Sequence, residues 1–102
     1  MARFDVYRTF MPHVPLILDV QSRLLGHLTT RVGIPLYPWS AARQEGLPRL
    51  KPRIMVSEAA YLLSTTEIAA LPVSDLGAFV ENIEARHGDD ILAALDFLFS
   101  GF

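Results

Sequence analysis

The chain has no cysteine among its 102 residues. This absence excludes a disulfide framework and any metal site built on thiolates, and it fits a reducing cytoplasm. Long apolar runs are missing as well, because stretches such as 15–18 are far shorter than the roughly 20 residues that span a bilayer. Residues 1–7 lack the apolar core of a signal peptide. We therefore expect a soluble protein with a cytoplasmic location.

Neither sign of charge dominates the chain, since the formal net charge is −2 and the sequence pI is near 5.8. This balance argues against a broad surface for nucleic acid, so we expect no direct nucleic-acid binding. The histidines at positions 13, 27 and 87 (His13, His27 and His87) lack the spacing of metal ligands. We therefore expect neither a metal site nor a cofactor.

About half of the residues are hydrophobic (51%), which is far from the composition of a disordered chain. The length predicts that residues 1–102 form one small domain. The core of such a domain is modest, so dimerisation would add stability.

Short apolar segments separated by turn residues fill the first two-thirds of the chain, a pattern that predicts β-strands. We expect the first two strands to form a hairpin around the loop with Pro12 and Pro15, and the last two to form another. The third strand is expected to end near Pro35 and Pro38. The five segments are 4–7, 16–20, 31–36, 53–56 and 61–64.

Two further segments have weaker signals. Residues 37–51 carry prolines, a glycine and scattered charges, so we expect a long irregular excursion with one helical turn near Ala41. Residues 75–86 place apolar side chains at helical spacing behind polar capping residues, whereas Gly77 and Val80 suit a strand. Helix and strand both stay open there.

Residues 89–102 have the pattern of an apolar helix that ends near the chain terminus. On a wheel at about 100° per residue, Asp96 and Ser100 fall together on one side, with Ala93 and Phe97 beyond them. The remaining apolar side chains fill an arc of roughly 160°, which we expect to pack on the rest of the domain. These side chains are Ala94, Leu98, Ile91, Phe102, Leu95, Phe99 and Leu92.

Both ends of this helix carry suitable residues. The aspartates at 89–90 suit its start, because carboxylates there cap free N–H groups and meet the positive end of the helix dipole. Gly101 suits its end. Packing alone does not explain why Asp96, Ser100 and Phe102 gather at the exposed end, so they are candidates for a functional surface. Strands followed by this helix predict a small β-barrel or curled sheet covered by a C-terminal helix, an α+β fold.

Several motifs, in order and at matching intervals, resemble the CcdB toxins over essentially the whole chain. After the last of these motifs come Gly77, Val80 and a terminal helix that ends in aromatic-x-Gly-hydrophobe. The motifs are Asp19-Val20-Gln21-Ser22, Ile34-Pro35-Leu36, Thr65-Thr66 and Pro72-Val73-Ser74.

The resemblance implies a mainly β fold, an SH3-like barrel or curled antiparallel sheet with a C-terminal α-helix, as in CcdB and MazF toxins. It also implies the toxin of a type II toxin–antitoxin module, which is not an enzyme itself. Members of the family form homodimers, bind the A subunit of DNA gyrase and trap this topoisomerase on cleaved DNA. A CcdA-like antitoxin neutralises the toxin, and the two together repress their own operon through DNA contacts of the antitoxin.

The resemblance also implies the residues that contact gyrase. Two apolar residues after the Asp-Val-Gln-Ser motif correspond to Leu24 and Leu25 here. The other contacts come from the last turn of the terminal helix, where the matching positions are Asp96, Phe99, Ser100, Gly101 and Phe102.

Ser100 is the main departure from the family, because it stands where the best-known members have tryptophan. That tryptophan stacks with its dimer mate against an arginine of gyrase, and a serine has no ring to do so. Such stacking is worth roughly 0.5–2 kcal/mol per contact. The resemblance therefore implies gyrase binding of reduced or altered potency, unless Phe99 or Phe102 compensates.

Two other functions stay open. A non-toxic CcdB-fold partner of an antitoxin is favoured by Asp96 and Ser100. A MazF-like ribonuclease would need basic residues beside a hydroxyl, although basic residues on strands are usually a solvated face. The candidates for such a site are Ser22, Arg23, Arg31, Arg49, Lys51, Arg53 and Thr65.

Overall fold

The computed structural model of the protein describes residues 1–40 and 47–101. Its helices are α1 (Glu84–Ser100) and the short 3-10 helices η1 (Arg23–Leu25), η2 (Thr65–Glu67) and η3 (Val73–Asp75). Its strands are β1 (Asp5–Thr9), β2 (Leu16–Asp19), β3 (Thr30–Pro38), β4 (Arg53–Val56), β5 (Ala59–Leu63), β6 (Ala69–Pro72) and β7 (Leu76–Asn82).

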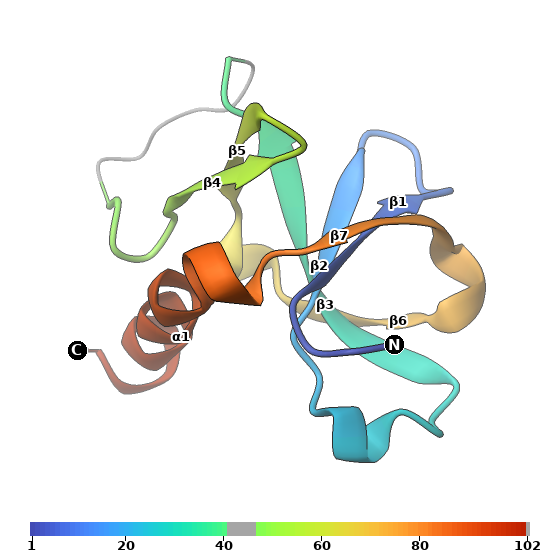
Figure 1. Ribbon diagram of the computed structural model, residues 1–102. Helices are drawn as coiled ribbons and strands as arrows, with labels where there is room; N and C mark the ends of the chain where they lie inside the picture. Colours follow the sequence, from blue (N-terminus) through green and yellow to red (C-terminus); the bar gives the residue numbers. More distant parts are fainter. Residues whose placement is uncertain (41–46, 102) are drawn as a thin grey trace.

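The strands form one curled antiparallel sheet with the order β4-β5-β3-β2-β1-β7. The long strand β3 pairs with β6 over Thr30–Gly33 and with β5 over Leu36–Pro38. Pro35 lies where β3 passes from one partner to the other, in keeping with the confinement of proline to interruptions of a ladder. Figure 1 shows the sheet curling on itself, with α1 beside it. The prediction of a mainly β curled sheet with a C-terminal helix is confirmed.

The main core fills the inside of the curl. Alternate residues along the strands point inward, as the period of two of a strand requires. Ile83, at the junction of β7 and α1, and Ile91, on α1, complete the core. The other residues of this core are Phe4, which comes just before β1, and the strand residues Val6, Leu16, Leu18, Ile34, Leu36, Ile54, Val56 and Leu63.

A smaller apolar cluster covers part of the outer face of the sheet. Tyr7, Ile17 and Leu71 are its buried members, and Met11, Val14 and Leu76 pack against them. A Cβ atom on Gly33 would lie 2.9 Å from the side chain of Ile17 and 3.0 Å from that of Leu71. The glycine is therefore needed at this point, because any larger residue in β3 would push the cluster apart.

Side chains from the junction of β7 and α1 cover the outer edge of β4. The N–H of Ser57 donates to the carboxylate of Glu81 at 2.6 Å, and the N–H of Met55 donates to Nε2 of His87 at 3.1 Å. The carbonyl of Met55 accepts a hydrogen bond from Arg86, whose guanidinium also pairs with Glu81 at 2.8 Å. The Ser57 N–H and Arg86 hold the pKa of Glu81 below its usual value. These bonds join the two end strands of the sheet and close the curl.

The two predicted hairpins are confirmed, with small shifts of their ends. β1 pairs with β2, and β4 pairs with β5. The strand predicted at 31–36 is longer, because β3 runs through both prolines to Pro38, so residues 37 and 38 do not belong to the irregular excursion. Strand β6 was not predicted, since Ala69 and Ala70 carry little β propensity. The helical turn expected near Ala41 lies outside the described residues.

The open segment 75–86 contains both structures, with strand over Leu76–Asn82 and helix from Glu84. The prediction that the terminal helix starts at the aspartates of 89–90 is wrong. The side chain of Asn82 accepts the N–H of Glu84 at 3.0 Å and so satisfies a free N–H group at the earlier start of the helix. Ile83, fully buried, fixes the chain at this point.

The wheel predicted the packing face of the helix only in part. Ile91 and Ala94 are buried and Leu95 packs on the core, as expected. Leu92 and Phe99, which were expected to pack, are exposed. Figure 1 shows the C-terminal end of α1 running away from the sheet, which accounts for exposure close to the end of the helix, as at Phe99. Leu92 lies in the middle of the helix, so its exposure shows that the packed face is narrower than the wheel predicted. Among the described residues, no helix is long and apolar enough to cross a membrane.

Candidate functional site

Leu24 and Leu25 form an exposed apolar turn between β2 and β3. They belong to η1, in which no residue is buried, and the side chain of Leu24 is 84% exposed. The hydroxyl of Ser22 accepts the N–H of Leu24 at 3.2 Å and caps the turn. Leu28 is exposed nearby in sequence. The turn thus offers apolar side chains to solvent on a short, hydrogen-bonded scaffold.

A buried polar network lies under this turn. The side-chain amide of Gln21 donates to the carbonyl of Leu25 at 3.1 Å and accepts the N–H of Val32 at 2.9 Å. Asp19 accepts the backbone N–H of Gln21 at 3.0 Å. The guanidinium of Arg31 holds the same carboxylate through Nε at 2.9 Å and Nη2 at 2.7 Å. The network connects β2 and β3 to the base of the turn.

Burial controls the charges of this network, because Asp19 and Arg31 are each only 1% exposed. Burial raises the pKa of Asp19, while the hydrogen bonds from Gln21 and Arg31 act in the opposite direction. Burial and a hydrogen bond to Asp5 raise the pKa of the neighbouring Tyr7 to about 12. The expectation of a solvated face is wrong for Arg31, since its guanidinium is enclosed with a carboxylate instead of facing water.

The end of α1 presents the second group of candidate residues. Asp96 and Ser100 are exposed, as the wheel predicted, and Phe99 is 72% exposed. Gly101 ends the helix in a left-handed conformation with φ of 79°, and its N–H donates to the carbonyl of Phe97 at 3.0 Å. Phe102 lies outside the described residues. A large aromatic ring therefore stands in solvent beside a carboxylate and a hydroxyl.

Phe97 differs from its neighbours on this last stretch of helix. The wheel put it beyond Asp96 and Ser100, on the side turned from the core, yet it is half-buried. The guanidinium of Arg49 lies over its ring at 5.0 Å from the ring centre. A cation over an aromatic face is an attractive pair, so the segment before β4 is joined to the helix here.

The structure brings together each group of candidates but does not join the two groups in one chain. Leu24 and Leu25 are adjacent on η1, and Asp96, Phe99 and Ser100 share the end of α1. Figure 1 shows the turn after β2 and the C-terminal end of α1 at separate places on the molecule. A ligand that contacts both groups within one chain would have to be large.

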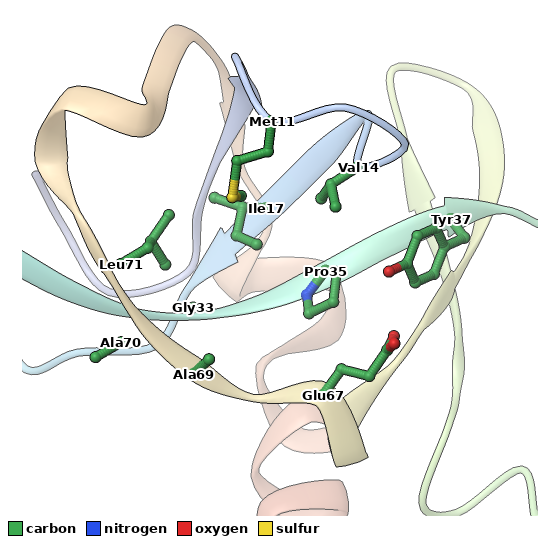
Figure 2. Close-up of a pocket in the computed structure, with 10 residues that line it drawn as sticks. All are labelled: Met11, Val14, Ile17, Gly33, Pro35, Tyr37, Glu67, Ala69, Ala70 and Leu71. Atoms are coloured by element: carbon green, nitrogen blue, oxygen red, sulfur yellow. The ribbon is translucent and has the colours of Figure 1, made fainter.

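A cavity of about 250 Å³ opens on the outer face of the sheet, where β2, β3 and β6 meet. Figure 2 shows apolar side chains around most of it, with Tyr37 and Glu67 at one end. Burial and the Glu67 carboxylate, which accepts a hydrogen bond from the hydroxyl, raise the pKa of Tyr37. The lining residues are Met11, Val14, Ile17, Gly33, Pro35, Tyr37, Glu67, Ala69, Ala70 and Leu71. No sequence motif pointed to this cavity, because its residues come from separate segments of the chain.

Two of the residues considered for RNA cleavage, Ser22 and Arg23, line one pocket with Arg3 and Glu84, and four of the others lie elsewhere. Arg31 is enclosed with Asp19, Arg49 lies over Phe97, and the guanidinium of Arg53 lies over the ring of Trp39 at 5.7 Å. Thr65 is fully buried in η2. Within residues 1–40 and 47–101, no group of histidine and acidic side chains is arranged to hold a metal ion.

Solved structures share this fold. One is the Mycobacterium tuberculosis toxin MazF-mt6, with a TM-score of 0.76 and 15% sequence identity over 93% of this chain and 95% of that one. Another is an endoribonuclease in complex with its cognate antitoxin from a mycobacterial species, with a TM-score of 0.73 and 19% identity over 94% and 89% of the two chains. The curled sheet with a terminal helix is thus the fold of a class of small toxins, and at these identities the likeness extends to the fold alone.

A match between the sequence and a protein-family model defines the family of the chain. Residues 3–101 match the model of the family described as CcdB protein, which is nearly the whole chain. The protein therefore belongs to the CcdB family, whose members are toxins of toxin–antitoxin modules, and the predicted membership is confirmed.

Proposed function

We propose that the protein acts by binding the A subunit of DNA gyrase through the η1 turn and the end of α1, and that it is not itself an enzyme. The observation that carries this proposal is the exposure of two large apolar side chains, Leu24 at 84% and Phe99 at 72%, on hydrogen-bonded elements. Exposed apolar residues on ordered scaffolds are typical of protein-binding surfaces. Membership of the CcdB family supports gyrase as the partner.

We further propose that the binding surface is completed by a homodimer. The two candidate groups lie at separate places in one chain, and a second copy would bring its own turn and helix end to the same partner. A dimer would also add stability to a chain of this size. Light scattering of the purified protein is expected to give twice the mass of 11.4 kDa.

The function can be tested with purified protein, supercoiled plasmid and gyrase from the source organism. We expect inhibition of supercoiling and accumulation of cleaved DNA that stays bound to the enzyme. Leu24→Asp is the variant that tests the proposed surface. It places a charge on an exposed side chain, so it should abolish gyrase inhibition without unfolding the protein. Gyrase that turns over normally in excess toxin would contradict the proposal. Growth arrest on expression without antitoxin separates a live toxin from a non-toxic partner.

We propose that an antitoxin segment occupies the cavity in Figure 2. Apolar walls formed by Met11, Val14 and Leu71 suit an apolar side chain, and Glu67 at one end suits an adjacent lysine or arginine. The cavity shares no residue with the proposed gyrase surface, so both partners can contact the toxin during neutralisation. Ala70→Trp should fill the cavity, weaken antitoxin binding and leave gyrase inhibition unchanged. Equal antitoxin affinity in the variant would place the antitoxin elsewhere.

Ribonuclease activity is the second candidate, and the fold likeness to an endoribonuclease favours it. The side chains argue against it, since Arg31, Arg49 and Arg53 are each engaged within the protein. Incubation of the purified protein with RNA decides between the two functions. Cleavage that is lost in Arg23→Ala would support the ribonuclease and remove gyrase as the sole target.

A further inference from the structure

The η1 turn has no apolar anchor of its own. None of its residues is buried, so burial of apolar surface contributes little to its position. Its local bonds run from the N–H of Leu25 to Ser22, of Gly26 to Arg23, and of Leu28 to Leu25, at 3.0–3.2 Å. These bonds shape the turn but do not connect it to the sheet.

Among the described residues, the side chain of Gln21 joins the turn to the sheet by hydrogen bonds at both ends. Its amide nitrogen donates to the carbonyl of Leu25, and its amide oxygen accepts the N–H of Val32 in β3. Only a side chain that donates at one end and accepts at the other can make both bonds. A methionine of similar length could make neither of them.

The backbone of Gln21 is fixed by a hydrogen bond to Asp19. Its N–H donates to Oδ1 of Asp19, while Oδ2 of the same carboxylate is bound by Arg31. All three side chains are buried. A buried ion pair adds little net stability compared with apolar packing, so stability alone is a weak reason for this arrangement.

We propose that Gln21 is a positioning residue that holds Leu24 and Leu25 in their binding geometry, with Asp19 and Arg31 as its foundation. This inference rests on the proposed role of the turn in gyrase binding. An exposed side chain binds well only when its backbone is already fixed, because ordering it on association costs free energy. The glutamine supplies this order from within the sheet, without contacting the partner.

The test uses Gln21→Met in the full-length protein, with Ile54→Val as the matched control. Ile54 is a buried residue of β4, an end strand of the sheet that pairs with β5 and not with β2 or β3, and its truncation lowers stability without touching the turn. Amide hydrogen exchange reports on the turn directly, through the N–H groups of Leu25, Gly26 and Leu28. Gyrase affinity and the thermal midpoint are measured on the same samples.

In Gln21→Met we expect the amides of the turn to exchange at least about tenfold faster and gyrase to bind roughly tenfold more weakly, the change that one lost hydrogen bond can produce. In Ile54→Val both quantities should stay within about twofold of the wild type. Unchanged exchange in Gln21→Met, or an equal loss of gyrase affinity in both variants, would overturn the inference. Gln21→Asn, whose shorter amide cannot span the same gap, serves if the methionine variant does not fold.

The exchange measurement separates this inference from the proposed function. If the wild type does not bind gyrase, the proposed function fails, and faster exchange in Gln21→Met would still identify the residue that holds the turn. If exchange rises while gyrase affinity is unchanged, gyrase binding stands and the positioning role of Gln21 is wrong.

Discussion

The two halves of the proposed gyrase surface are built in opposite ways. The η1 turn stands on a buried network in which Gln21, Asp19 and Arg31 are joined by hydrogen bonds. Within the part of the chain that the structure describes, no buried polar network of this kind lies under the end of α1, where Phe99 and Ser100 are exposed. Change in the network under the first site disturbs the interior, whereas change at the second site alters only the surface. The resemblance to the family puts the position of its tryptophan at the second site, at Ser100.

The largest expected effect comes from breaking the network. Asp19→Ala should lower the free energy of unfolding by about 3–5 kcal/mol, because it leaves the buried guanidinium of Arg31 without a counterion. Urea denaturation measures this change. Replacing both members with apolar residues, as in Asp19→Leu with Arg31→Met, should cost less than the single change. A loss below about 1 kcal/mol in Asp19→Ala would show that the two halves do not differ in this way.

The next effect is a loss of gyrase affinity at the end of α1 with little change in the free energy of unfolding. Phe99→Ala should change the free energy of unfolding by less than about 0.5 kcal/mol, because the ring is exposed. Gyrase affinity should fall by roughly 30-fold, as for a binding hot spot worth about 2 kcal/mol. Ile91→Ala, on the buried face of the same helix, is the contrasting variant and should lose about 2–4 kcal/mol of stability. A fall in stability of similar size in both variants would contradict the division of the helix into two faces.

A gain is expected at the position that departs from the family. Ser100→Trp restores a ring at the exposed end of α1 and should strengthen gyrase binding by about 0.5–2 kcal/mol for each stacking contact. Stability should be unaffected, since Ser100 is exposed in the free protein. Isothermal titration with the gyrase fragment measures the gain. No improvement would mean that Phe99 already supplies the stacking.

The smallest effect at neutral pH concerns the hydroxyl of Tyr7, whose pKa is raised to about 12 from an ordinary value of 10.0. The fold therefore favours the neutral hydroxyl, and this contribution is fully present below the ordinary pKa and is lost as pH rises toward the raised one. Stability of the wild type should fall more steeply than that of Tyr7→Phe across this range. Equal slopes in alkaline urea titrations would contradict the assignment.

The sequence predicts those parts of the fold that depend on local pattern. Short apolar segments placed β2 and β4 close to their observed ends, and Gly101 marked the end of the helix. Strand β6 was missed because its residues pair with β3 for reasons of distant topology and not of their own propensity. The helix start was missed because the side chain that accepts the N–H of Glu84 is that of Asn82, which belongs to the preceding strand.

The residues of the candidate site were predictable from the family resemblance, but the buried residues that hold the η1 turn in place were not. Leu24, Leu25 and the helix end came from the family resemblance, and the structure adds that Leu24 and Phe99 are largely exposed. Gln21 was visible only as part of a motif, because its partners at positions 25 and 32 are defined by the fold of the turn. Burial of Arg31 could not be read from composition, since a charged residue enters the interior only when a partner meets it there.

The covered edge of β4 has a consequence for the free toxin. An open strand edge invites pairing with other chains, and aggregation follows from it. His87 and Glu81 accept the N–H groups of Met55 and Ser57 along this edge, and His87 lies on α1. Detachment of this helix would therefore free the N–H of Met55 at the same moment as it displaced Phe99. The helix that carries Phe99, a residue of the proposed gyrase surface, also covers part of this edge, so we expect loss of binding and loss of solubility to occur together.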